Sequence, residues 1–180
     1  MHGNGRLPSE LELETSAGRD AIVLAGPSLR GTIYRSRGRP FYYRLLSLDD
    51  EAPIHVRHEA TEWVQQPRRA GLAPIVEARQ EQGFFFLRYE TGAQRSLAEA
   101  LGDPDLGVRL AHGAKALSAL PDWWKTFGSG LLPMPAEIVF SRDGLPSLLP
   151  MPGRRLPKVE AVLAEPARGP YLAPEIVCGR

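Results

Sequence analysis

Short apolar stretches rich in β-branched and aromatic residues alternate with turns containing Gly or Pro over the first half of the chain. This alternation is typical of strands joined by tight connections. The strands expected from it cover residues 21–26, 30–36, 40–47, 74–80 and 83–89, and a helix is expected at 51–66. Five strands and one helix in the first 90 residues indicate an α+β fold.

The pattern changes to helical spacing after about residue 92. Residues 96–102 predict a short helix, and residues 105–120 carry leucines and alanines along one face of a longer one. A hairpin is expected where the apolar runs 136–140 and 145–150 flank a Ser-Arg-Asp-Gly turn. The remainder, 150–175, is rich in proline and has no regular pattern.

Composition and charge narrow the class of protein. The 180 residues are 43% hydrophobic and 24% charged, which are ordinary globular values, and a net charge of +1 gives no field that would draw nucleic acid. Cys178 is the only cysteine, so neither a disulfide framework nor a thiolate metal cluster is expected. Neither a signal peptide nor an apolar run near the roughly 20 residues of a membrane helix is visible. These features predict a cytoplasmic protein without a nucleic-acid partner or a membrane span.

The segment LAGPSLRGTIYR at 24–35 continues into a strand-like run, whereas a dinucleotide-binding loop would open a helix. It resembles the glycine-rich loop of protein kinases, which joins two antiparallel strands. In this resemblance Gly26 and Gly31 take the places of the first and third glycines, and Ser28 takes the place of the second.

Further segments resemble kinase motifs in the kinase order. FYYR is similar to the Val-Ala-Ile-Lys of the third kinase strand, which puts Tyr42 at the alanine and Arg44 at the lysine. RHEATEW supplies Glu59 where the first kinase helix carries its glutamate. FFFLRYETG resembles the fifth strand and the hinge, and the hinge residues would be Arg88, Tyr89 and Glu90.

The second half continues the resemblance. PAEIVFSRDGLPSLLP is similar to the end of the catalytic loop and the strand pair after it, and YLAPE resembles the Ala-Pro-Glu that closes the activation segment. That closure falls on Ala173, Pro174 and Glu175. The order and spacing over 21–175 resemble a bacterial-type Ser/Thr protein kinase truncated after Ala-Pro-Glu. The alternative is an unrelated α+β module with a fortuitous Ala-Pro-Glu.

The resemblance implies a division of the chain. Residues 1–18 are expected to be a loose leader, and 19–91 a kinase-like N-lobe with a five-stranded antiparallel sheet and one helix. Residues 92–180 would form the first part of a helical C-lobe, including a degenerate catalytic loop and the activation segment.

The residues that kinases use for phosphoryl transfer are missing at the matched positions. No lysine precedes Lys115, and Asn4 is the only asparagine, so neither the strand lysine nor the magnesium-binding asparagine has a counterpart. Glu137 stands at the asparagine position, and Pro150 stands at the metal-binding aspartate. The catalytic-loop His-Arg-Asp falls on residues 130–132, which are Gly-Leu-Leu. No bound metal is therefore expected.

The matched nucleotide site predicts poor binding of ATP. Arg44 has the charge of the missing lysine and is expected to pair with Glu59, or else to face solvent. Tyr42 would fill space that the adenine needs. No cofactor is expected, and weak, metal-independent binding of ATP stays an open alternative.

The sequence thus predicts a catalytically inactive kinase-like domain, a pseudokinase, that acts as a binding or regulatory module in signalling. The alternatives are a divergent ATP-binding Ser/Thr protein kinase and an unrelated protein-binding module. A protein partner is expected, because the apolar face of helix 105–120 and the YLAPEIV segment would be left uncovered. That cover would come from the C-lobe helices of a longer chain, which we favour, or from a separate partner.

Overall fold

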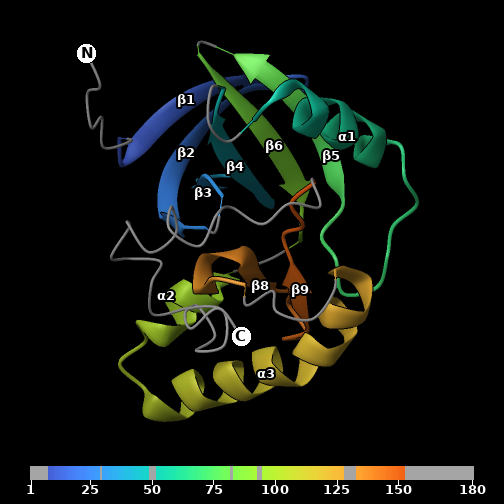
Figure 1. The fold of residues 1–180 in the computed structure, drawn as a ribbon. Helices are drawn as coiled ribbons and strands as arrows, with labels where there is room; N and C mark the ends of the chain where they lie inside the picture. The colour runs from blue at the N-terminus through green and yellow to red at the C-terminus, as the bar shows by residue number, and fades with distance from the viewer. Residues whose placement is uncertain are drawn as a thin grey trace, which may run out of the picture.

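The computed structural model places an antiparallel sheet above a smaller part built mainly from helices (Figure 1). It describes residues 8–28, 30–48, 52–81, 83–92, 95–127 and 133–152. Positions 173–175, which the resemblance matched to Ala-Pro-Glu, lie outside the described residues.

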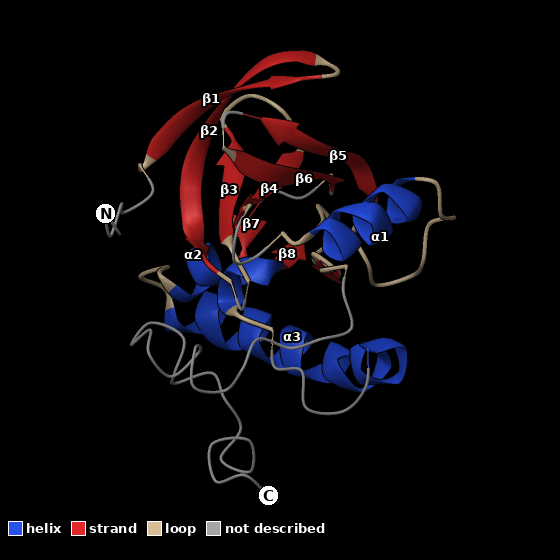
Figure 2. Cartoon of the chain, turned by 45° about the horizontal axis from the view of Figure 1, so that its top comes forward, coloured by secondary structure: helices blue, strands red, loops and turns tan. Residues whose placement is uncertain are grey.

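Six strands form the larger sheet, in the order β1-β2-β3-β4-β6-β5 with every neighbouring pair antiparallel. They are β1 (Glu10–Thr15), β2 (Gly18–Pro27), β3 (Thr32–Ser36), β4 (Phe41–Ser47), β5 (Ile75–Glu81) and β6 (Phe84–Glu90). Among the described residues this part has one helix, α1 (Ile54–Val64), which packs beside β5 (Figure 2). The five strands and the helix expected from the apolar pattern are all present.

Strand β1 corrects the expectation of a loose leader, because it lies within residues 1–18 and makes the sheet six-stranded. Its sequence ELELET alternates, and Leu13 on the inward side is 1% exposed. The tight turn to β2 is made at Gly18, whose φ of 94° suits glycine. Pairing with β2 in register, Leu13 opposite Asp20, gives this segment a hydrogen-bonded partner and a place in the core.

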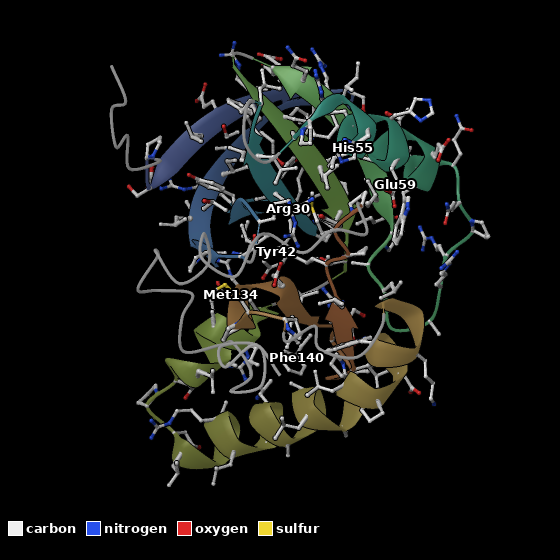
Figure 3. All side chains as sticks on the ribbon, viewed as in Figure 1. Arg30, Tyr42, His55, Glu59, Met134 and Phe140 are labelled. Atoms are coloured by element: carbon white, nitrogen blue, oxygen red, sulfur yellow. The ribbon has the colours of Figure 1, made fainter. Side chains whose placement is uncertain are left out.

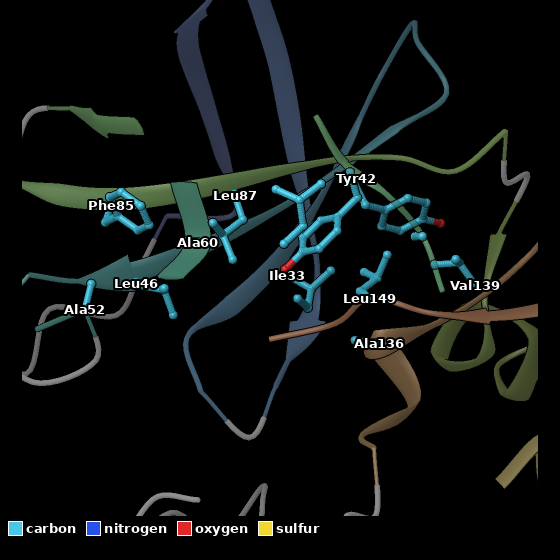
Figure 4. Close-up of a cluster of buried hydrophobic side chains, with 13 residues drawn as sticks. Ile33, Tyr42, Leu46, Ala52, Ala60, Phe85, Leu87, Ala136, Val139 and Leu149 are labelled. Atoms are coloured by element: carbon cyan, nitrogen blue, oxygen red, sulfur yellow. The ribbon is translucent and has the colours of Figure 1, made fainter. Parts of the chain in front are cut away.

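The sheet curves around two apolar clusters, one on each face, and β4 contributes to both. Tyr43 and Leu45 point to the cluster shared with β1 and β2. Tyr42 and Leu46 point the other way, into a cluster that reaches α1 and the smaller part of the molecule (Figure 4). Arg44 lies between Tyr42 and Leu46 on that same face, since side chains alternate along a strand.

The smaller part contains a three-stranded sheet, β7-β8-β9, and two helices. Its elements are β7 (Arg95–Ser96), α2 (Leu97–Leu101), α3 (Leu106–Phe127), the 3₁₀ turn η1 (Pro135–Glu137), β8 (Ile138–Phe140) and β9 (Pro146–Leu148). Ser96 caps α2, because its hydroxyl accepts from the Glu99 N–H while the Glu99 carboxylate accepts from the Ser96 N–H. The expected short helix, long helix and hairpin are confirmed.

Helix α3 is longer than expected, since it passes through Pro121 and ends at Phe127. Proline removes one helical hydrogen bond, but Trp123 holds the last turns in place. Trp123 is 3% exposed, and its Nε1–H donates to the Gly71 carbonyl at 2.9 Å. At 22 residues α3 is still not apolar enough to cross a bilayer, and neither is any other helix in the described part of the chain.

Candidate functional site

A fully buried arginine lies where the large sheet meets the smaller part. Arg44 is 0% exposed, and all three of its side-chain nitrogens donate hydrogen bonds. Nε donates to the Tyr89 hydroxyl at 3.1 Å, and the second terminal nitrogen donates to the Leu149 carbonyl at 2.9 Å. The first terminal nitrogen contacts the Ser28 hydroxyl and the Arg30 carbonyl, each at 3.0 Å, and Glu137 Oε1 at 2.7 Å.

Glu137 is the anionic partner of Arg44 and is itself held on both carboxylate oxygens. Its side chain is 6% exposed, and its second oxygen accepts from the Met134 N–H at 2.8 Å. The Glu137 carbonyl accepts from the Leu149 N–H at 2.8 Å, which ties η1 to the end of β9. The ion pair therefore links β4 of the large sheet to the smaller part.

The turn that follows β2 folds back on itself and joins the same network. The Ser28 hydroxyl donates to the Gly31 carbonyl at 3.0 Å while it accepts from Arg44. Gly31 has a φ of 78°, and a Cβ added there would lie 2.2 Å from the Leu45 carbonyl oxygen. Gly26 faces Ala136, where an added Cβ would come within 3.0 Å. Both glycines are thus needed for close packing of the turn against its neighbours.

Tyr89 connects β6 to this network from the other side. Its hydroxyl accepts from Arg44 and donates to the Pro150 carbonyl at 2.8 Å. Burial raises the pKa of Tyr89 above its usual value, although the neighbouring guanidinium opposes that shift. Burial works against the charge of Arg44, but Tyr89 and Glu137 together outweigh it and raise the pKa of Arg44. Arg44 therefore stays charged although it is buried, because Glu137 and the surrounding hydrogen-bond acceptors stabilise the guanidinium.

Tyr42 fills the junction beside the arginine. Its side chain is 1% exposed within the cluster of Figure 4, and its hydroxyl donates to Glu99 at 3.2 Å. Glu99 also pairs with Arg35 at 2.6 Å. Burial first, and then the Glu99 carboxylate, raise the pKa of the Tyr42 phenol. Tyr42 thus spans from the sheet to the start of α2.

The predicted Arg44–Glu59 pair is wrong. Glu59 lies on α1 and forms no ion pair with any other described residue, whereas Arg44 is paired with Glu137. Figure 3 shows Glu59 on α1, away from Tyr42 at the junction. The alternative of a solvent-facing Arg44 is equally wrong. On α1, Val56 and Ala60 are the buried residues.

The three residues expected to form the hinge, Arg88, Tyr89 and Glu90, are the last three residues of β6. Arg88 is 6% exposed on β6, pairs with Glu77 at 3.2 Å and stacks over the Phe41 ring at 4.8 Å. Glu77 also accepts from the Ser16 N–H and hydroxyl, both at 2.9 Å, so this pair clamps the β1–β2 turn onto β5 and β6. Glu90, at the end of β6, pairs with Arg68 on the surface.

The donor set does not fit magnesium-bound ATP. Within the described residues no three His, Cys, Asp or Glu side chains gather as they would around a metal. Both oxygens of Glu137 are already bound, Pro150 offers only a carbonyl that Tyr89 occupies, and Arg44 makes five contacts within the protein. A nucleotide phosphate or a metal ion would have to displace these bonds.

Comparison with known proteins supports the kinase-like fold. The sequence matches no protein-family profile and no curated protein. The structure, however, is similar to the crystal structure of Rad53 1–466 in complex with AMP-PNP, with a TM-score of 0.56 at 13% sequence identity. The alignment covers 94% of this chain and 43% of that one. The fold is protein-kinase-like.

At this identity the likeness shows the fold alone, and the chain spans less than half the length of the protein kinase that it resembles. Within this kinase-like fold the matched positions come together on one network: Ser28, Arg44, Tyr89, Glu137 and Pro150. Other expected residues make their polar contacts elsewhere: Tyr42 with Glu99, Arg88 with Glu77 and Glu90 with Arg68. Glu59 lies on α1, away from the network. The Arg44–Glu137 pair was not expected from the sequence, because 93 positions separate its two members.

Proposed function

We propose that this chain is a catalytically inactive protein-kinase-like domain that serves as a binding or regulatory module in cytoplasmic signalling. The observation that carries the proposal is the buried Arg44–Glu137 ion pair at 2.7 Å. By the kinase resemblance, these two residues replace the strand lysine and a metal-binding asparagine. Here they bind each other.

Arg44 supports inactivity because all of its side-chain nitrogens already donate hydrogen bonds within the protein. A kinase lysine contacts the nucleotide phosphates as a compact cation, whereas a guanidinium is a planar fork that satisfies several acceptors at once. In this chain those acceptors are the Ser28 and Tyr89 hydroxyls, two backbone carbonyls and one carboxylate. Removing them to admit a phosphate would leave buried polar groups unpaired, which costs about 1–3 kcal/mol for each group.

Metal binding is disfavoured for the same reason. Magnesium in kinases neutralises the phosphates, and its ligands are an asparagine and an aspartate. The matched residues here are Glu137, bound to Arg44 and Met134, and Pro150, which has no ligating side chain. With Tyr42 buried in the space beside them, the site lacks both the room and the ligands for magnesium-bound ATP.

The experiment is a thermal-shift titration of the full 180-residue chain with ATP, in the presence and absence of magnesium or manganese. We expect no metal-dependent change in Tm at ATP concentrations up to about 1 mM, since a ligand stabilises only when it exceeds its Kd. A metal-dependent rise of several degrees would contradict the proposal and favour a divergent ATP-binding kinase.

A further inference from the structure

A cavity of about 460 Å³ lies at the boundary between the two parts of the fold, a volume within the range of small-molecule pockets. The segment between α1 and β5, the end of β6 and strand β9 form its walls. Its polar and charged lining residues are Arg68, Arg69, Glu90, Thr91 and Ser147. The described contacts of Arg44 include none of them, so this cavity is separate from the Arg44 network.

The segment between α1 and β5 is held in place by hydrogen bonds to three other elements. Figure 1 shows it descending from α1 toward the end of α3 before it returns to β5. The Gly71 carbonyl accepts from the Leu148 N–H of β9 and from the Trp123 Nε1–H of α3, each at 2.9 Å. The Pro74 carbonyl accepts from the Glu90 N–H of β6 at 3.1 Å. The cavity wall is therefore preformed, and a ligand would not have to order it.

The charged groups of the lining do not balance. Arg68 pairs with Glu90. Arg69 Nη2 donates to Gln66 Oε1 at 3.2 Å, and the guanidinium lies 5.8 Å from the centre of the Trp63 ring. Both of these neighbours of Arg69 are uncharged, and within the described part of the chain Arg69 forms no ion pair. The lining thus carries two cations and one anion, which leaves one positive charge in excess.

We propose that this cavity binds the carboxylate of a ligand with a short apolar body, and that Arg69 is its main donor. A guanidinium has five N–H groups, of which Arg69 gives one to a described acceptor, and the others suit the two oxygens of a carboxylate. A single carboxylate neutralises the excess charge, whereas a phosphate dianion would leave an excess negative charge beside Glu90. Leu72 and Pro74 line the same cavity and offer apolar contact. The proposal does not depend on whether a nucleotide binds.

The first experiment is a nuclear magnetic resonance titration of the ¹⁵N-labelled full chain with 3-phenylpropionate. One charge-assisted contact and partial burial of a small ring predict a Kd on the order of 1 mM. The largest shifts should fall on the amides of the lining residues Ala70, Leu72 and Gly92. The uncharged amide of the same acid should bind at least about tenfold more weakly, because it lacks the charge that Arg69 would meet.

Three variants separate the roles of the charged residues. Arg69→Gln should raise the Kd at least about tenfold. Glu90→Gln should lower it at least about twofold, because it releases Arg68 from an exposed ion pair and adds to the excess positive charge. Arg79→Gln is the matched control, since Arg79 is an exposed arginine of β5 outside the cavity, and it should leave the Kd unchanged. All three side chains reach solvent, so the Tm should stay within about 2 °C of the wild type.

Equal binding of the acid and its amide, or an unchanged Kd in Arg69→Gln, would overturn the proposal. So would shifts gathered around Arg44 instead of the cavity, or no saturable shift up to about 20 mM acid. A second titration, with a peptide blocked at both ends that carries one glutamate beside one phenylalanine, identifies the source of the carboxylate. Binding of the peptide tighter than that of the free acid supports the site as one for an acidic side chain of a partner protein. Weaker binding of the peptide supports it as a site for a small carboxylic acid.

Discussion

Arg44 Nη1 lies 2.7 Å from Glu137 Oε1, and the two side chains are 1% and 6% exposed. The pair joins β4 to η1 across the boundary between the two parts of the fold. Because neither charge can reach water, each depends on the other and on the hydrogen bonds around them. Arg44, which the sequence resemblance matched to the kinase lysine, thus forms a buried ion pair in this chain.

Removing the carboxylate should destabilise the protein strongly. Glu137→Ala leaves Arg44 buried without an anion, and breaking a buried pair in this way costs about 3–5 kcal/mol. Urea unfolding, followed by circular dichroism, measures the loss. The matched control is Glu14→Ala, which breaks the exposed 2.7 Å pair with Arg19 and should change the midpoint little. Equal effects of the two substitutions would show that the Arg44–Glu137 pair is not structural.

Replacing Arg44 with lysine, the residue that kinases carry at the matched position, should not create a nucleotide site. In Arg44→Lys the ammonium cannot reproduce the fork that reaches Tyr89, Glu137 and the Leu149 carbonyl together. We expect a loss of roughly 2–4 kcal/mol from the contacts to the charged group that are given up. Isothermal titration with ATP and magnesium should give no heat of binding. Tight, metal-dependent binding by this variant would mean that Arg44 alone blocks the site.

The clamp on the β1–β2 turn can be tested separately. Glu77→Ala removes the anion that pairs with Arg88 and accepts from Ser16. Amide hydrogens of β1 should then exchange faster than those of β4, because the edge hairpin opens locally before the sheet unfolds. Glu12→Ala, on an exposed side chain of β1, serves as the control. Uniform acceleration across the whole sheet would instead indicate a global loss of stability.

The sequence predicted those strands and helices whose local pattern of apolar and polar residues matches their burial in the fold. The strands around Ile33, Tyr42 and Phe86 are apolar, β-branched or aromatic and bounded by turns, and their sheet gives them the burial that such residues require. Strand β1 carries a similar signal, the alternation of ELELET, but its glutamates make it resemble a solvated leader. Its place in the sheet depends on pairing with β2, and the local sequence of β1 does not specify that pairing.

The site was predicted only in part, because its partners come from distant segments. The kinase resemblance singled out Arg44 and Glu137 as nucleotide-site positions and Tyr89 as a hinge residue, and in the structure both Tyr89 and Glu137 contact Arg44. It assigned Arg44 to Glu59, however, since kinases pair a lysine with the helix glutamate. Nothing local in the sequence favours Glu137 instead. The choice depends on the return of η1 and β9 to the sheet, where Glu137 and the Leu149 carbonyl meet the guanidinium.

Buried tyrosines should make the fold sensitive to alkali. Burial raises the pKa of Tyr34, Tyr42, Tyr43 and Tyr89 in the folded chain, compared with about 10 in an unfolded one. Raised folded values mean that the folded state holds these protons more tightly. Their contribution to stability is therefore complete below about pH 10 and is lost as the pH rises toward the folded pKa values.

Each such tyrosine steepens the fall in unfolding free energy by up to about 1.4 kcal/mol per pH unit in that window. Urea midpoints between pH 8 and 11 measure the fall, and absorbance at 295 nm reports tyrosinate. Tyr42→Phe removes one titrating group and one 3.2 Å hydrogen bond to Glu99, so it should lower the midpoint slightly at pH 8 and flatten its decline above pH 10. The described tyrosines should ionise only as the chain unfolds. If their tyrosinate signal appears while circular dichroism is still native, the phenols are open to solvent and the packing of Tyr42 at the junction is wrong.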